Sequence, residues 1–205
     1  MGLKISKSKC AVFARKFKFL GHQFDLDLKG TQIPDKRVES LLNMRVPVSQ
    51  AEVLSRVSMC NYFSSYLPQH KKVILPLTKM AMSEGFYWRQ LEQEAFENLK
   101  MLISLRIKNS VIDTTKLLFC CTDCSQISCA FMIFQIDNKG TMQVIATDSR
   151  ILKSADRKKS ASFQELLALM FSILETEQLI RNHNQEVIFI SRLCLITIVT
   201  QIVNF

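Results

Sequence analysis

The sequence predicts a mixed protein of the α+β or α/β class with two modules, one rich in helices and one built on a mixed sheet. The hydrophobic pattern changes from a helical period to a strand period near residues 111–115. A length of 205 residues allows two small domains, and 48% hydrophobic with 22% charged residues excludes a disordered chain. We therefore place the modules at residues 1–112 and 113–205.

The distribution of charge agrees with this division. The chain has 27 Lys and Arg against 18 Asp and Glu, a net charge of +9. Counting basic against acidic side chains, residues 1–50 have 10 and 4, residues 51–112 have 8 and 5, and residues 113–205 have 9 and 9. The net charges of the three segments are therefore +6, +3 and 0, so the whole excess lies in the first module. A basic module favours a partner such as a phosphate backbone. A solvated basic face is the alternative.

The first module is expected to begin with a hairpin. Phe17–Phe24 alternates apolar and polar residues and is followed by the turn residues Lys29-Gly30. Ile33-Pro34-Asp35 then opens a helix that runs to about Met44, and Pro47 closes it.

Two longer helices follow. Ser49 and Glu52 have the spacing of a capping box at the start of a helix that runs towards Pro68. A further helix is predicted over Arg89–Leu105, because apolar residues recur there at intervals of three and four. Its predicted apolar face consists of Leu91, Ala95, Leu99 and Leu102.

The second module changes to strands. We predict strands at Lys116–Thr122, Ala130–Ile136 and Met142–Thr147, a helix at Ser160–Ile180 and a further strand at Val187–Ile190. This order is typical of a mixed α/β sheet. The predicted apolar face of the helix consists of Phe163, Leu166, Leu167, Met170, Phe171 and Leu174.

The cysteines indicate a reducing compartment. Seven is an odd number, and no amino-terminal segment has the apolar core of a secretory signal. We therefore expect an intracellular protein, cytoplasmic or nuclear. Cys121 and Cys124 form a C-x-x-C pattern, but a second ligand pair at zinc-site spacing is missing, so these thiols are expected to be small buried residues of a strand.

Two segments could indicate a membrane. Met1–Ser6 fits the myristoylation pattern at Gly2, and basic residues follow it. The run Val187–Phe205 is apolar, but Arg192 interrupts it and Leu193–Val203 is too short to span a bilayer. We expect no membrane span and leave the modification of Gly2 open.

Short motifs along the chain share the order and spacing of one family. They are Lys9–Phe13, Phe19–His22, Ile33–Lys36, Cys60–Phe63, Pro76-Leu77, Phe86–Trp88, Ala95–Lys100, Thr122–Ser125, Ser149-Arg150 and Gln164–Ala168. Together they resemble the Pol polyprotein of gypsy-type LTR retroelements, the first seven its reverse transcriptase and the last three its ribonuclease H.

The resemblance implies a map of the chain. The segment Phe19–Phe24, with Phe19 and Gly21, resembles the primer-grip hairpin. Residues 33–105 resemble the thumb and connection, and residues 113–195 a ribonuclease H-like fold. The fingers and palm are not matched, so we expect no polymerase active site in this chain. Gly2 then falls in family sequence that follows the palm, which weighs against myristoylation.

The same resemblance implies a degenerate nuclease site. Asp123 and Glu165 match two catalytic carboxylates, but Ser191 lies where the family has an aspartate, and Arg192 follows it. Two-metal hydrolysis needs several converging carboxylates, and an arginine opposes a divalent cation. We therefore expect no cofactor and no efficient nuclease activity. Weak binding of Mg²⁺ by Asp123 and Glu165, with weak Mg²⁺-dependent ribonuclease H activity, is an alternative.

Nucleic-acid binding is the function that remains. The first 20 residues contain basic side chains and no acidic one, and another basic pair lies where the family's thumb approaches the duplex. The expected partner is RNA or an RNA/DNA duplex, bound without sequence preference. The expected contacts are Lys4, Lys7, Lys9, Arg15, Lys16, Lys18, Phe19, Gly21, Lys71 and Lys72. The alternative is a retained fold that serves as a structural or interaction subunit, with residues 193–205 docking on a protein partner.

Overall fold

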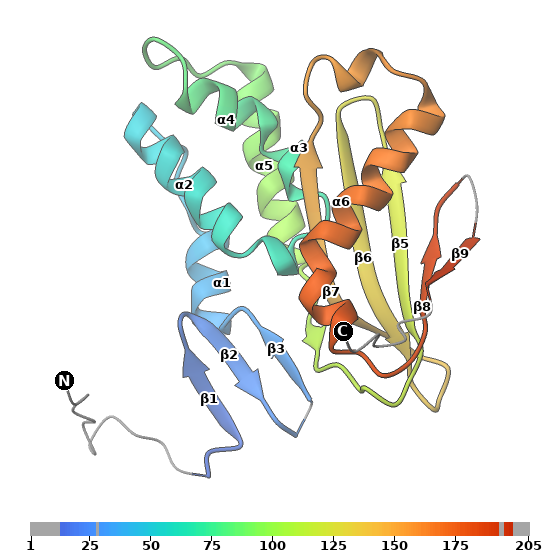
Figure 1. Cartoon of the computed structure of the whole chain (residues 1–205). Coiled ribbons are helices and arrows are strands. Elements are labelled where there is room, and N and C mark those ends of the chain that lie inside the picture. Colours follow the sequence, from blue (N-terminus) through green and yellow to red (C-terminus); the bar gives the residue numbers. More distant parts are fainter. Residues whose placement is uncertain (1–12, 28, 193–194, 199–205) are drawn as a thin grey trace, which may run out of the picture.

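The computed structural model describes residues 13–27, 29–192 and, for the backbone, 195–198. Two sheets organise the described chain (Figure 1). The smaller has the order β1-β2-β3-β4 and is antiparallel; the larger has the order β7-β6-β5-β8-β9, with β5 and β8 parallel and the other neighbours antiparallel. The smaller sheet comprises β1 (Lys16–Phe19), β2 (His22–Asp25), β3 (Gly30–Gln32) and β4 (Asn109–Ser110). The larger comprises β5 (Leu118–Cys124), β6 (Ser128–Ile136), β7 (Met142–Ile151), β8 (Val187–Ile190) and β9 (Leu195–Ile198).

The helices follow the predicted order. They are α1 (Asp35–Leu42), α2 (Gln50–Tyr62), α3 (His70–Val73), α4 (Leu75–Ala81), α5 (Gln90–Ser104) and α6 (Ala161–Arg181), with short 3₁₀ turns η2 (Ser64–Tyr66) and η3 (Asp156–Lys158). The mixed α and β architecture is thus confirmed, and the long elements begin and end within a few residues of their predicted bounds. The strand β4 and the short helices α3 and α4 were not predicted, since each is too short to show a period, and β9 lies in the apolar carboxyl-terminal run.

The predicted hairpin with its turn before Gly30 is formed by β2 and β3, but the predicted strand Phe17–Phe24 contains a further turn that divides it into β1 and β2. Phe19 pairs with His22, so Leu20 and Gly21 form a two-residue turn with φ of +46° and +74°. The Tyr62 hydroxyl of α2 donates a hydrogen bond to the Leu20 carbonyl. A Cβ atom on Gly21 would lie 3.2 Å from the Tyr62 hydroxyl oxygen, so glycine serves both the turn and the contact with α2.

Capping differs slightly from the predicted box. The Ser49 hydroxyl accepts from the Glu52 amide as expected, but the Glu52 carboxylate accepts from the Val48 amide and pairs with Arg45. On α5 the predicted face is partly wrong, because Leu91 is 60% exposed. The buried positions of that helix are Glu92, Ala95, Phe96, Leu99 and Ile103.

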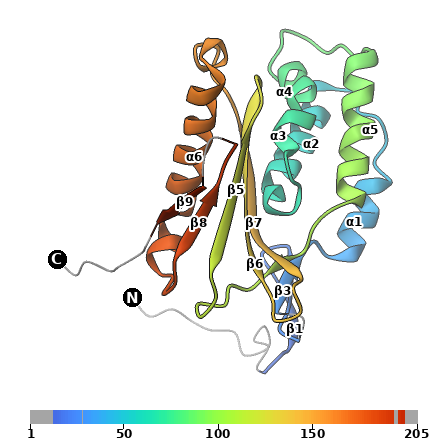
Figure 2. The ribbon, with the colours of Figure 1, turned by 90° about the vertical axis from the view of Figure 1, so that its right-hand side faces the viewer.

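Two hydrophobic cores form, and side chains join the halves that contain them. One core lies among α1, α2, α4 and α5, and the other lies between α6 and the larger sheet. Figure 2 shows α6 on one face of that sheet and α2 to α5 on the other. The Thr147 hydroxyl donates to the Ser65 carbonyl at 3.3 Å, and the Lys71 amide donates to the Ser149 hydroxyl at 3.3 Å. The first half therefore packs against β7.

The helix α6 packs differently from its predicted apolar face. Phe171 is buried, but the apolar side chains Phe163, Leu166, Met170 and Leu174 are exposed by 39%, 49%, 51% and 67%. The side that packs on the sheet includes Gln164, Glu165, Ser172 and Thr176. The helix is apolar on two nearly opposite sides, and only one of them contacts the sheet.

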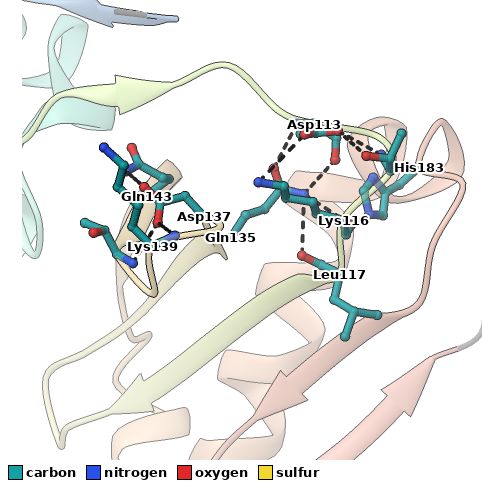
Figure 3. A network of polar contacts seen from close by, with 10 residues as sticks. Asp113, Lys116, Leu117, Gln135, Asp137, Lys139, Gln143 and His183 are labelled. Carbon is teal, nitrogen blue, oxygen red and sulfur yellow. Dashed lines mark hydrogen bonds and ion pairs between the residues drawn. The ribbon is translucent and has the colours of Figure 1, made fainter.

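The linker between the cores is held by one buried glutamine (Figure 3). Gln135 is 3% exposed, accepts from the Asp113 amide at 2.8 Å and donates to the Asp113 carbonyl at 2.8 Å and the Lys116 carbonyl at 3.2 Å. The His183 ring nitrogen Nε2 donates to the same Lys116 carbonyl at 2.8 Å. The linker is thereby tied to β6 and to the end of α6.

Replacement of Gln135 by Leu should destabilise the fold. The variant leaves the backbone groups of Asp113 and the Lys116 carbonyl without this buried partner, and we expect a loss of about 2 kcal/mol in the free energy of unfolding. Urea denaturation measures it, with Gln126→Leu at an exposed position as the control. Equal midpoints for the two variants would contradict the role given to Gln135.

Candidate functional site

The parallel strands β5 and β8 bring Asp123, a predicted catalytic carboxylate, next to Arg192. The register pairs Leu118 with Val187 and Cys121 with Ile190. Extended by two residues, the same register places Asp123 beside Arg192. Parallel strands end at the same edge of a sheet, and a ligand site commonly lies there.

The two side chains form an ion pair. Arg192 Nη2 lies 3.2 Å from Asp123 Oδ1, and the side chains are 74% and 49% exposed. Asp123 Oδ1 itself is buried and accepts no hydrogen bond from the described residues. The guanidinium and the carboxylate therefore attract each other by charge, but their geometry is not that of a hydrogen bond. An ion pair this exposed contributes little to stability.

Glu165 completes the cluster from α6. The Ser160 hydroxyl caps this helix by accepting from the Phe163 amide, which sets Glu165 in the second turn. Glu165 is 5% exposed, and its Oε2 atom has no hydrogen-bond partner among the described residues. Burial and the neighbouring charge of Asp123 raise the pKa of Glu165, while Arg192 and a hydrogen bond from the Cys124 amide oppose the rise.

The structure therefore brings together Asp123, Glu165 and Arg192, the residue that follows Ser191. We tested whether this set fits the Mg²⁺ ions of a two-metal site. Within residues 13–27, 29–192 and 195–198, no group of three or more His, Cys, Asp or Glu could hold a metal ion. The Arg192 cation also lies against one of the two carboxylates. The described residues do not fit a two-metal site.

The cysteines of the C-x-x-C pattern do not converge. Cys121 and Cys124 are three residues apart in β5, so they point to opposite faces of the sheet. Burial raises the pKa of Cys120 and of Cys124 to about 12. Both are neutral thiols in the sheet, on the side that faces α6.

The basic residues of the first strand differ in their surroundings. Arg15 pairs with Asp27 at 2.8 Å, and Lys16 pairs with Asp25 at 3.1 Å. The first 20 residues contain no acidic side chain, but the fold brings Asp25 and Asp27 next to the basic residues of this segment, which the sequence interpretation missed. Lys18 is exposed on the same strand. Lys4, Lys7 and Lys9 lie outside the described residues.

The aromatic residues of the hairpin divide in the same way. Phe17 and Phe24 stack on each other, with ring centroids 5.0 Å apart. Phe19, next to the Leu20-Gly21 turn, is 59% exposed. Of the three rings, Phe19 is the one whose exposure suits it to contact a base.

Lys71 and Lys72 lie on α3 but have different surroundings. Lys71 Nζ donates to the Asn61 side chain at 2.6 Å, and its charge lowers the pKa of Asp148, which burial raises overall. Lys72 is exposed.

A cavity lies between the segment before α3 and Asp123. It has a volume of about 190 Å³ and is lined by Asp123 of β5 and by Pro68 and Gln69, just before α3. Sequence reasoning missed it, because the lining residues come from segments far apart in the chain.

No helix in the described part of the chain is long and apolar enough to cross a membrane.

Comparison with known proteins agrees with this geometry. Residues 88–188 match the model of the RNase H-like domain found in reverse transcriptase. The chain is 27% identical over 173 residues to the retrovirus-related Pol polyprotein from transposon 412 of Drosophila melanogaster. It is 23% identical over 185 residues to the corresponding polyprotein from transposon opus of the same organism. These matches cover 84% and 83% of this chain, but only 14% and 18% of the two polyproteins.

Solved structures have the same fold. The foamy viral protease-reverse transcriptase in complex with an RNA/DNA hybrid aligns over 90% of this chain and 25% of its own, with a TM-score of 0.75 and 16% identity. The same viral protein in complex with dsDNA aligns with a TM-score of 0.74 and 16% identity, over 90% of this chain and 38% of its own. Residues 88–188 therefore belong to the RNase H-like domains found in reverse transcriptase, and the chain is a homologue of retroelement Pol polyproteins.

Proposed function

We propose that this chain binds a nucleic-acid duplex without sequence preference and does not cleave it efficiently. Residues 1–112 would grip the duplex, and residues 113–205 would contribute a degenerate ribonuclease H-like module. The observation that carries the proposal is the ion pair of Arg192 with Asp123, beside a serine where the family has a carboxylate. The foamy viral relatives were solved with an RNA/DNA hybrid and with dsDNA, which supports a duplex as the ligand class.

The duplex-binding residues of the proposal are the exposed lysines that form no ion pair with a neighbouring acid of the described chain. Lys18 and Lys72 are exposed, whereas Arg15, Lys16 and Lys71 each contact a neighbouring side chain. An exposed lysine can neutralise a phosphate and release a counterion, so affinity would fall steeply with salt.

Removal of the two exposed lysines should weaken duplex binding. The Lys18→Ala/Lys72→Ala variant should lose more than about tenfold in affinity for an RNA/DNA hybrid near 50 mM salt, and the slope of log K against log salt should fall by about 2. Fluorescence anisotropy at several salt concentrations measures both.

The matched control is Lys153→Ala/Lys158→Ala, which removes the same charge from two exposed residues of the second half. The proposal requires this control to bind nearly as the wild-type chain does. A wild-type chain that binds neither hybrid nor double-stranded DNA at low salt would refute it.

The proposal of inefficient cleavage rests on the charges of the carboxylate cluster. Two carboxylates and one guanidinium meet there, and Ser191 cannot supply a charged ligand. A divalent cation at Asp123 would be repelled by Arg192.

A hybrid-cleavage assay with Mg²⁺ tests this part. The wild-type chain should release no more product than the Asp123→Asn variant, because no metal-dependent step depends on that carboxylate. Mg²⁺-dependent cleavage that disappears in Asp123→Asn would instead establish the alternative, a weak ribonuclease H.

A second candidate function, a structural or interaction subunit, is favoured by the exposed face of α6. The side chains of Phe163, Leu166, Met170 and Leu174 lie on the side of the helix that does not pack on the sheet. A helix that is apolar on both sides is usually covered on both. The partner surface predicted at residues 193–205 falls mainly outside the described residues.

Charge on this face should abolish any association that it mediates. We expect the wild-type chain to associate with increasing concentration in sedimentation velocity, and Met170→Glu/Leu174→Glu to remain monomeric. The control Met101→Glu/Leu105→Glu places the same substitutions at the same spacing at the end of α5, on Met101 and on the C-cap Leu105, whose side chains are 60% and 69% exposed. A wild-type chain that stays monomeric at all concentrations would argue against this function.

A further inference from the structure

We propose that the Arg192 guanidinium is a phosphate-binding group of this site, so that the chain holds a phosphodiester there without a divalent metal. The inference rests on the proposed binding of a duplex and assigns a contact in the second half of the chain, outside the basic first half. The ligand class is a backbone phosphate of the bound nucleic acid.

The placement of Arg192 follows from the sheet. The parallel register of β5 and β8 sets residue 192 beside Asp123, and the ion pair of 3.2 Å anchors one side of the guanidinium. The side chain is 74% exposed, so donors not directed at Asp123 face solvent. A guanidinium has five donors in a planar fork that matches two phosphate oxygens, and this fork is preorganised for phosphate.

The charges around Arg192 are compatible with an anionic ligand. Asp123 balances one positive charge, and Glu165 is buried beneath the cluster at 5% exposure. Burial and the charge of Asp123 raise the pKa of Glu165, while Arg192 lowers it. The cavity at Asp123 is lined on its other side by Pro68, Gln69 and Thr147, none of which carries a charge.

A divalent cation would have to displace this arrangement. A cation bound by the Asp123 carboxylate would lie close to the guanidinium that contacts Oδ1, and the like charges would repel each other at short distance. The arginine therefore provides the positive charge at the site, and phosphate binding becomes independent of Mg²⁺.

Duplex affinity measured with and without Mg²⁺ tests the inference. The wild-type chain should bind an RNA/DNA hybrid equally in EDTA and in excess Mg²⁺ at constant ionic strength. Arg192→Ala should bind about tenfold more weakly near 50 mM salt, with a salt slope lower by about 1. Arg192→Lys, which keeps the charge and loses the fork, should lie between the two.

Arg181→Ala is the matched control. Arg181 is 76% exposed and pairs with Glu177, which is 52% exposed, at 2.7 Å, so its removal changes net charge and surface as Arg192→Ala does. Circular dichroism and thermal melting establish that each variant is folded; Arg192→Lys replaces Arg192→Ala if the latter fails to fold.

The outcomes separate the two proposals. If the wild-type chain does not bind the hybrid, the proposed function itself fails. If it binds and Arg192→Ala matches Arg181→Ala, duplex binding stands and Arg192 is only a counterion of Asp123, which overturns the inference. Stronger wild-type binding in Mg²⁺ than in EDTA also overturns it.

Discussion

The parallel pairing of β5 with β8 is the constraint on which the rest of the site depends. It sets residues 187–190 against residues 118–121, so the chain leaves both strands at one edge with Asp123 beside Arg192. The pairing is buried through Leu118, Cys120, Val187 and Phe189, each at most 1% exposed. A register slip would move these side chains to the wrong face, so the core that stabilises the sheet also fixes the ion pair.

The two halves are joined by polar contacts as well as by the chain itself. Gln135 holds the linker, and Thr147 and Ser149 of β7 bond to Ser65 and Lys71 of the first half. These bonds place the segment before α3 next to the cavity at Asp123. A duplex bound by the basic first half would thus approach a site at which the positive charge is that of Arg192.

Much of the fold was predictable because long elements have a clear period. The strand at 187–190, the helix at 161–181 and the Ser49 cap agree with their sequence patterns. The face of α6 was not predictable in the same way. Its apolar residues lie on two sides, and periodicity cannot tell which side meets the sheet; polar residues such as Gln164 are buried there because backbone carbonyls of Asp156 and Arg157 accept from them.

The sequence by itself determined the family motifs, the order of the elements and the incomplete carboxylate set, since these depend on residue types and their spacing. Only the tertiary structure decided which charges are neutralised. Asp25 and Asp27 return to β1 through a hairpin, and Arg192 reaches Asp123 through a parallel pairing across some 70 residues of chain. Coulomb interactions depend on distance in space, which sequence separation does not give, so the net charge of the chain did not reveal the charge of its site.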